Sequence, residues 1–284
     1  ALSRDLRRMR FAYESAGLCP LGVGALAGVN YKNDRDFLAS ALGFDGTTPN
    51  SMDTTADRDF ALDFLYASSV LGMHLSRFCE ELVLWSTAEF SFVKLSDRVT
   101  TGSSIMPQKR NPDVAELIRG KTGRLYGNLI TLLTVMKGLP FTYNRDMQED
   151  KEPLFDSIDT VKLSLEGMIE MLKDAAFNEA VLRRAVYRNF STATDLADYL
   201  VKKGVPFRKS HEIVGNVVRH CEKTGEDFFT LPVETLRTFE PLISDDVKDV
   251  LDPASSTERK LSKGSTAKKE ILAQIEALRA QLKK

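Results

Sequence analysis

The stretch DRDFALDFLYASSVLGMHLSRFCEELVLW, from Asp57 to Trp85, decides the fold of this chain. Its large apolar side chains advance by threes, fours and sevens, which is the spacing of one face of an α-helix. Helices longer than about twenty residues suit a bundle rather than a small globule. The stretch therefore predicts one long bundle helix. The residues that follow the helical spacing are Phe60, Phe64, Leu71, Leu75, Phe78, Leu82 and Trp85.

Two further segments repeat this periodicity. We expect one helix over roughly Asp113–Lys137 and another in the stretch after Pro153. Strand signals are weak, and FSFVKL (Phe90–Leu95) is a short candidate. The sequence thus predicts an all-α fold, a long-helix bundle. The side chains expected to face inward in the first segment are Leu117, Ile118, Leu125, Leu129, Leu132 and Met136. The apolar residues that follow the helical spacing in the second segment are Leu154, Ile158, Val161, Leu165, Met168 and Leu172.

Some of these helices are apolar on more than one face. The run LITLLTVMKGL (Leu129–Leu139) is an example. Burying both sides of a long helix is easiest in an oligomer, which the pattern therefore favours. A monomeric bundle with thick core helices stays open as the alternative.

The pattern changes to shorter helices, punctuated by glycine and proline, after about Lys173. We predict a long-helix domain over residues 1–183 and a smaller helical C-terminal domain over residues 184–284, ending in a charged helix over Ala267–Lys284. The chain starts without Met, in a segment that already has a helical pattern. We therefore expect it to be a piece of a longer protein.

The composition narrows the class of protein. The 39 basic and 40 acidic residues give a formal net charge of -1, which argues against a basic surface for nucleic acid. No run of eighteen apolar residues predicts a membrane span. The three cysteines show no CxxC spacing and favour a reducing compartment, so we expect a cytoplasmic protein. The three histidines and three cysteines show no metal-ligand spacing, and no cofactor is indicated.

The loop TGSSIMPQKRNPD, from Thr101 to Asp113, is dense in hydrogen-bonding and charged groups. Asn111-Pro112 predicts a helix start, with Asn111 as the cap. Capping does not require the serine pair or Lys109. A serine close to an ammonium at a helix N-terminus lies in a positive field, which favours its alkoxide and attracts carboxylate ligands. Local chemistry leaves two alternatives open, a site for an anionic ligand and an ordinary loop.

The segment GSSIMPQKRNP resembles the signature of the fumarase/aspartase superfamily, whose members cleave C–N or C–O bonds and release fumarate. Gln108 is the form found in argininosuccinate lyases and the related lens δ-crystallins. PLGVGALAG (Pro20–Gly28), TADRDF (Thr55–Phe60) and KGLPFTYNRDMQEDKEPLFD (Lys137–Asp156) agree. The resemblance covers essentially the whole chain, which looks like the last three-fifths of such a lyase. The family's Ser-Arg-Asn and Thr-His motifs do not occur in it.

The resemblance implies a reaction and a first set of residues. The reaction is reversible elimination of fumarate from argininosuccinate, which gives arginine and needs no metal or cofactor. Ser103 matches the family's catalytic base, and Ser104 is the alternative base and a substrate-binding residue. Lys109 would stabilise the developing negative charge, and Asn111 would hold a substrate carboxylate. Glu116 matches a position that supports the family's histidine.

A second set of residues follows from YNRDMQEDK. Tyr143, Gln148 and Lys151 match family positions that hold the arginine-and-carboxylate portion of the ligand. Gln148 and Lys151 are three apart, hence on one face if the segment is helical. Arg58 either braces the site by pairing with a carboxylate or forms a structural ion pair. His74, His211 and His220 are read as core or surface histidines.

The family members implied by the resemblance are homotetramers in which each active site gathers segments from three subunits. We expect the loop around Ser103 to close over a small-molecule substrate as a mobile lid. Two other readings stay open: a non-enzymatic, crystallin-like homologue, and another fumarate-releasing lyase of the superfamily. We expect little or no turnover from this polypeptide alone, because the motifs it lacks belong to the family's site.

Overall fold

The computed structural model describes residues 1–188 and 190–282. It divides into two compact units, Ala1–Phe177 and Asn178–Lys284. The domain boundary predicted near residue 183 falls inside helix α7 (Glu179–Tyr187), and the ranges 1–183 and 184–284 stay a prediction. The last two residues of the predicted C-terminal helix lie outside the described residues.

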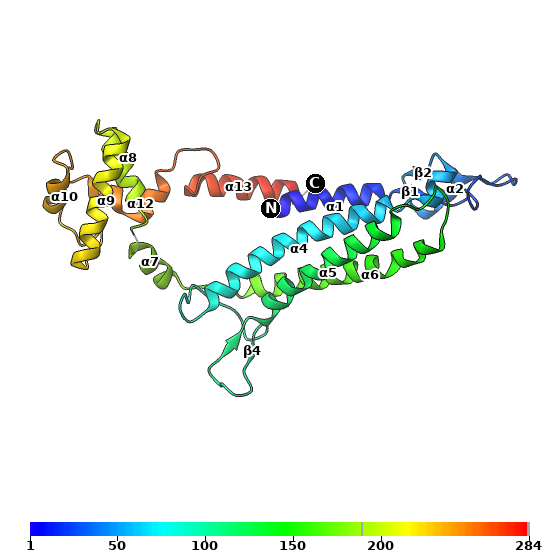
Figure 1. Ribbon diagram of the computed structural model, residues 1–284, viewed down its shortest axis with the longest axis horizontal. Coiled ribbons are helices and arrows are strands. Elements are labelled where there is room, and N and C mark those ends of the chain that lie inside the picture. The colour runs from blue at the N-terminus through cyan, green and yellow to red at the C-terminus, as the bar shows by residue number, and fades with distance from the viewer. Residues whose placement is uncertain (189, 283–284) are drawn as a thin grey trace. The chain divides into compact units, whose positions relative to one another are not determined.

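Three long helices form the first unit. They are α4 (Asp59–Ser86), α5 (Asp113–Met136) and α6 (Lys151–Lys173), with 28, 24 and 23 residues. Figure 1 shows them running side by side, with α1 (Leu2–Ser15) along α4. The predicted all-α long-helix bundle is confirmed. No helix in the described part of the chain has the length and apolar character needed to cross a bilayer.

Short elements connect these helices. Strand β1 (Leu18–Cys19) pairs in parallel with β2 (Gly46–Thr47). Strand β3 (Val93–Lys94), inside the segment Phe90–Leu95, pairs antiparallel with β6 (Ala176–Phe177). The remaining elements of the first unit are α2 (Arg35–Leu42), α3 (Ser51–Ala56), β4 (Thr101–Gly102), β5 (Arg110–Asn111) and the 3-10 helix η1 (Arg145–Asp150).

Helices α5 and α6 run antiparallel. Near the start of α5, Val114 lies against Gly167 of α6. Further along, the Asn128 amide donates to Ser157 Oγ at 2.9 Å. The 24 residues of α5 make its two ends about 36 Å apart at 1.5 Å per residue. The segment directly before α5 and the segment directly after it therefore lie at opposite ends of the bundle.

The core of the first unit lies where α4, α5 and α6 meet. Gly72 of α4 allows close contact, because a Cβ there would lie 2.6 Å from Leu125 Cδ1. Ser69 Oγ donates to the carbonyl of Leu125 at 3.1 Å, so the two helices are also hydrogen-bonded. The buried apolar residues of this core are Ala61, Leu65, Leu71, Leu75, Cys79, Leu82, Val93, Leu95, Val99, Ala115, Ile118, Leu125, Leu132, Val161, Met168 and Met171.

The bundle also exposes large apolar side chains. Leu117 was expected to face inward, and this prediction is wrong for the chain as it stands, because 62% of its surface is exposed. The helical period identifies an apolar position without identifying what covers it. The exposed apolar residues of the three helices are Phe60, Tyr66, Phe78, Leu84, Leu117, Tyr126, Ile130, Leu133, Phe155, Leu163, Leu165, Ile169 and Leu172.

Shorter helices form the second unit, as the change of pattern after Lys173 indicates. Its core centres on Phe228, which is 1% exposed, and on leucines of several helices. The helices after α7 are α8 (Ala193–Lys202), α9 (Phe207–Thr224), α10 (Val233–Phe239), α11 (Val247–Leu251), α12 (Pro253–Glu258) and α13 (Lys268–Leu282).

Candidate functional site

The loop that carries the serine pair is a β-hairpin leading into α5 (Figure 1). Strand β4 pairs antiparallel with β5, so residues 103–109 form the tip. At the base, the Thr101 hydroxyl donates to the carboxylate of Asp113, the first residue of α5. Asn111 lies in β5 and makes no cap to α5, so the predicted capping role is wrong. Asn111 instead pairs with Thr101 of β4.

The tip of this hairpin orders Ser103 through its own backbone. Ser103 Oγ accepts hydrogen bonds from the N–H groups of Ile105 at 3.2 Å and Met106 at 3.0 Å. The Lys109 N–H donates to the Met106 carbonyl at 3.1 Å and closes the turn. Two N–H donors aimed at one oxygen favour negative charge on it. The turn therefore suits an oxyanion at Ser103 Oγ.

The other groups predicted around Ser103 are accessible. Ser104 and Lys109 are exposed at the tip, and Glu116 is exposed in the first turn of α5. Lys109 makes no ion pair with any carboxylate of the described residues. Asn111 is half-buried in β5. The hairpin thus brings these residues to one end of the bundle with their polar groups available to a ligand.

The second predicted set lies around the start of α6. The Gln148 amide donates to the Tyr143 hydroxyl. Gln148 belongs to η1 and Lys151 begins α6, so the two do not share a face of one helix. The Lys151 ammonium donates to Asp150 Oδ1 at 2.8 Å. The structure brings Tyr143 and Gln148 into contact and attaches Lys151 to its sequence neighbour.

Asp150 is a residue of this site that the sequence analysis missed. Its carboxylate also accepts a hydrogen bond from Arg58 Nε, 92 positions away in the chain. The side chains of Asp150 and Arg58 are 11% and 18% exposed. Burial alone would raise the pKa of Asp150, but the cations of Lys151 and Arg58 outweigh it and lower the pKa. The one available signal was the place of Asp150 directly before Lys151.

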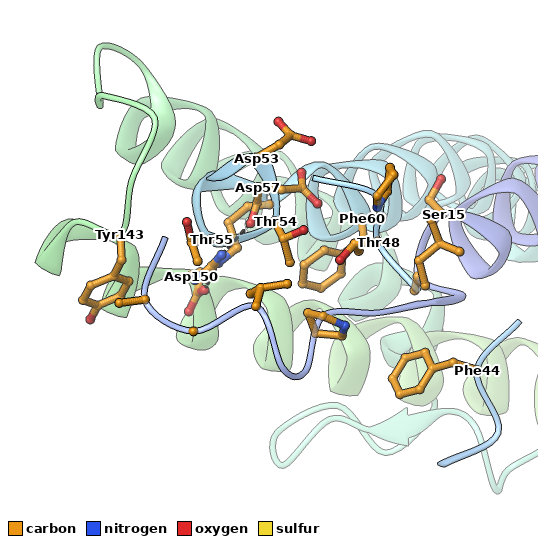
Figure 2. A pocket seen from close by; sticks show the side chains of 18 residues that line it. Ser15, Phe44, Thr48, Asp53, Thr54, Thr55, Asp57, Phe60, Tyr143 and Asp150 are labelled. Atoms are coloured by element: carbon orange, nitrogen blue, oxygen red, sulfur yellow. Dashed lines mark hydrogen bonds and ion pairs between the residues drawn. The ribbon is translucent and has the colours of Figure 1, made fainter. Parts of the chain in front are cut away.

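A cavity of about 790 Å³ lies beside this ion pair. Arg58 lines it, together with Tyr143, Asp150, Asp57 and Phe60, which Figure 2 shows. Burial raises the pKa of Asp57, and the charges of neighbouring carboxylates raise it further. The cavity therefore combines an aromatic wall with charged groups, which is the character of a small-molecule site.

Hydrogen bonds from the Arg35 side chain to backbone carbonyls hold segments that border the cavity. Arg35 of α2 donates to the carbonyls of Leu21 and Thr48, each at 2.9 Å. Gly24 lines the cavity at φ 70°, a conformation that favours glycine. These contacts fix the segment that faces the start of α4.

The two predicted sets lie at opposite ends of α5. The hairpin precedes the first residue of the helix, and Tyr143, Gln148 and Lys151 follow its last residue. The antiparallel packing of α6 keeps Lys151 at the far end. One chain therefore does not bring Ser103 and Lys109 together with Lys151.

The three histidines lie outside both sets. His74 Nδ1 lies 2.8 Å from Asp5 Oδ2, which ties α4 to α1. His211 is exposed and His220 is half-buried, both on α9. Their places agree with the reading as core or surface residues.

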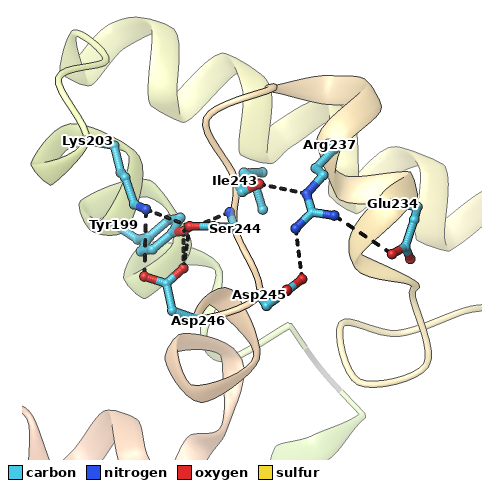
Figure 3. A network of polar contacts seen from close by, with 8 residues as sticks. All are labelled: Tyr199, Lys203, Glu234, Arg237, Ile243, Ser244, Asp245 and Asp246. Atoms are coloured by element: carbon cyan, nitrogen blue, oxygen red, sulfur yellow. Dashed lines mark hydrogen bonds and ion pairs between the residues drawn. The ribbon is translucent and has the colours of Figure 1, made fainter.

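The second unit contains a polar network that supports its fold (Figure 3). Tyr199 donates to Asp246 Oδ1 at 2.5 Å, and Lys203 donates to Ser244 Oγ at 2.7 Å. Ser244 Oγ in turn donates to Asp246 Oδ1 at 2.7 Å. The hydroxyl of Tyr199, together with the charge of Asp246, raises the pKa of Lys203. The network therefore ties the start of α11 to α8 through Asp246, Ser244 and Tyr199.

Comparison with known proteins identifies the family. A family model described as lyase matches residues 1–127, and one described as argininosuccinate lyase C-terminal matches residues 190–258. An argininosuccinate lyase of Syntrophus aciditrophicus is 54% identical over 274 residues, 96% of this chain. The chain belongs to the argininosuccinate lyase family of the fumarase/aspartase superfamily. An argininosuccinate lyase of Geobacter sulfurreducens is 53% identical over 96% of the chain.

The chain is also similar to solved structures. A variant of EDDS lyase with bound fumarate superposes on 99% of this chain with a TM-score of 0.92 and 31% identity. The chain spans 58–60% of the length of the two argininosuccinate lyases and 58% of the EDDS lyase chain. The family's long-helix fold is therefore present over nearly the whole of the chain.

Proposed function

We propose that the protein carrying this chain is an argininosuccinate lyase, which eliminates fumarate reversibly from argininosuccinate and releases arginine. One observation carries the proposal: the hairpin GSSIMPQKRNP holds Ser103 Oγ against two backbone N–H donors. Argininosuccinate lyases that share 53–54% of this sequence over 96% of the chain support the choice of substrate.

The proposed chemistry begins at Ser103. Its alkoxide, stabilised by the N–H groups of Ile105 and Met106, takes a proton from the carbon next to a substrate carboxylate. The electron pair of that C–H bond forms the double bond of fumarate, and the C–N bond breaks to release the guanidino nitrogen of arginine. The ammonium of Lys109 stabilises the dianionic carboxylate that forms on the way.

The remaining predicted residues bind and orient the substrate in this proposal. Ser104 and Asn111 hold a carboxylate of the fumarate half. Tyr143, Gln148 and Lys151 hold the arginine half, and the hydrogen bond from Gln148 to the Tyr143 hydroxyl supports their acting together.

Glu116 has a supporting role in the proposed site. Its exposed carboxylate in the first turn of α5 is available to position a proton-transfer group on another segment. It lies at the same end of the bundle as Ser103.

The two ends of the bundle take part in the same reaction only if different subunits contribute them. We therefore propose a homotetramer with shared active sites. The separation of the two sets along α5 supports it. The exposed apolar residues of α4, α5 and α6 support it as well, because such surfaces are typical of subunit interfaces.

We also propose a cytoplasmic location. The three cysteines, Cys19, Cys79 and Cys221, are free and buried. Unpaired cysteines are usual in proteins of reducing compartments.

The proposal is tested by assaying the protein expressed from its complete reading frame. Fumarate release is followed by ultraviolet absorbance for argininosuccinate, adenylosuccinate, malate and aspartate side by side. We expect release from argininosuccinate alone. Release from one of the others instead would assign a different lyase activity. A folded oligomer that releases fumarate from none of them would indicate a crystallin-like protein.

A further inference from the structure

We propose that Asp150 is a positioning residue, which holds the ammonium of Lys151 in place beside the cavity so that it meets a carboxylate of the ligand. The inference rests on the proposed function, because that function gives Lys151 its ligand. It adds a residue to the site and a specific role for the contact between Arg58 and Asp150.

The geometry of Asp150 fits this role. One oxygen of its carboxylate, Oδ1, accepts from the Lys151 ammonium at 2.8 Å. The other, Oδ2, accepts from Arg58 Nε. Asp150 lines the cavity of about 790 Å³, and Tyr143 lines the same cavity. The carboxylate therefore joins the outward-reaching lysine to the wall of the space where a ligand fits.

The two cations differ in how firmly they are held. Arg58 is 18% exposed and directly precedes α4, and its Nη1 also donates to the carbonyl of Asp57. Lys151 is 54% exposed and has one ion-pair partner among the described residues. Arg58 thus fixes the carboxylate, and the carboxylate fixes the lysine.

An ammonium has three donors, and the bond to Asp150 occupies one of them. Two donors of Lys151 stay available for a ligand carboxylate. A lysine without a partner would lose the rotational freedom of its long stem only when the ligand binds, which weakens binding. Holding the stem beforehand removes that cost from the binding step.

The pKa of Asp150 is consistent with a permanent charge. The bonds from Lys151 and Arg58 lower it in spite of the burial of the carboxylate. Asp150 is therefore ionised throughout the neutral range, and it always carries the charge that attracts Lys151.

A purely structural tie between α4 and η1 is the competing explanation. It predicts that loss of Asp150 disturbs the protein independently of Lys151. Positioning predicts instead that loss of Asp150 has no further effect once Lys151 is gone. A double-mutant cycle separates the two, because residues that act through one another give non-additive effects.

The experiment uses the protein expressed from its complete reading frame and measures KM and kcat for argininosuccinate. We expect Asp150→Asn to raise KM about tenfold with little change in kcat, as for the loss of one charge-assisted hydrogen bond in substrate binding. Asp150→Glu should restore most of the affinity. Lys151→Ala should raise KM further, and the double variant should match Lys151→Ala. The control Asp174→Asn, which breaks an exposed pair with Arg98, should behave as wild type.

Two outcomes would overturn the inference. One is a set of KM effects that add in the double variant, and the other is an Asp150→Asn enzyme with wild-type KM. If Asp150→Asn fails to fold, the variant Arg58→Gln/Asp150→Asn removes both partly buried charges, and its KM is read in the same way. An inactive wild-type protein would refute the proposed function itself, which distinguishes that failure from a failure of the inference.

Discussion

Mixed oligomers of two impaired variants test whether different subunits build one site. The variants are Ser103→Ala, at the hairpin before α5, and Lys151→Ala, after the end of α5. The helix between them has 24 residues, so its two ends lie about 36 Å apart in one chain. At a substrate concentration near the wild-type KM, each variant alone should release fumarate at a small fraction of the wild-type rate, because each homo-oligomer lacks either the proposed base or a substrate-binding group in every site.

Co-expression in equal amounts should restore activity. If a site takes its hairpin from one subunit and its lysine from another, random assembly gives both intact groups to roughly one site in four. Fumarate release by the purified mixed oligomers should therefore reach about a quarter of the wild-type rate. The matched control is Ser103→Ala with Lys109→Ala. Both lie on the same hairpin, so every site keeps one defect and activity should stay at background.

Recovery in the first mixture and none in the control supports shared sites. Mixed oligomers that contain both variants, are folded and show no recovery would refute the reasoning. That result would mean that one chain brings Ser103 to its own Lys151.

Three further predictions concern stability and reactivity. Burial raises the pKa of Cys79 to about 11, so its thiol should resist alkylation at neutral pH in the folded protein and react after unfolding in denaturant, as read by mass spectrometry. Phe228→Ala, at a side chain 1% exposed, should lower the unfolding free energy of the second unit by about 3–5 kcal/mol in a denaturant titration. The hydrogen bond from Tyr187 lowers the pKa of Asp252. The stabilisation by this carboxylate is therefore complete above its unfolded pKa of about 4 and lost as the pH falls through its lower native value. In thermal melts between about pH 5 and pH 3, Asp252→Asn should lose less stability than wild type.

The helical period predicted the long helices well, because α4, α5 and α6 bury one continuous face each. The stretch Asp57–Trp85 and the helix α4 nearly coincide. The same pattern could not show whether Leu117 is buried within its own chain. An apolar residue at a helical position has the same spacing whether its own chain or another subunit covers it. The second apolar face of α5 was visible in the sequence, but only the structure shows which of its residues are exposed.

Long-range contacts account for the features of the site that the sequence did not predict. Asn111 reads as a helix cap when only its neighbours are considered, but β4 and β5 pair across the loop and place it in a strand. In the sequence, Asp150 is one of two acidic residues in MQEDK. Its role depends on Arg58, which lies 92 positions earlier in the chain. No local pattern encodes such a pairing.

The most direct test of the account is fumarate release from argininosuccinate by the protein expressed from its complete reading frame, with its Ser103→Ala variant beside it. Both proteins are first shown to form the same oligomer. The account predicts steady release by the wild type and a loss of about a thousandfold or more in kcat for the variant, as for other catalysts that lose the group on which proton transfer depends. A variant that releases fumarate at the wild-type rate would contradict the role of Ser103.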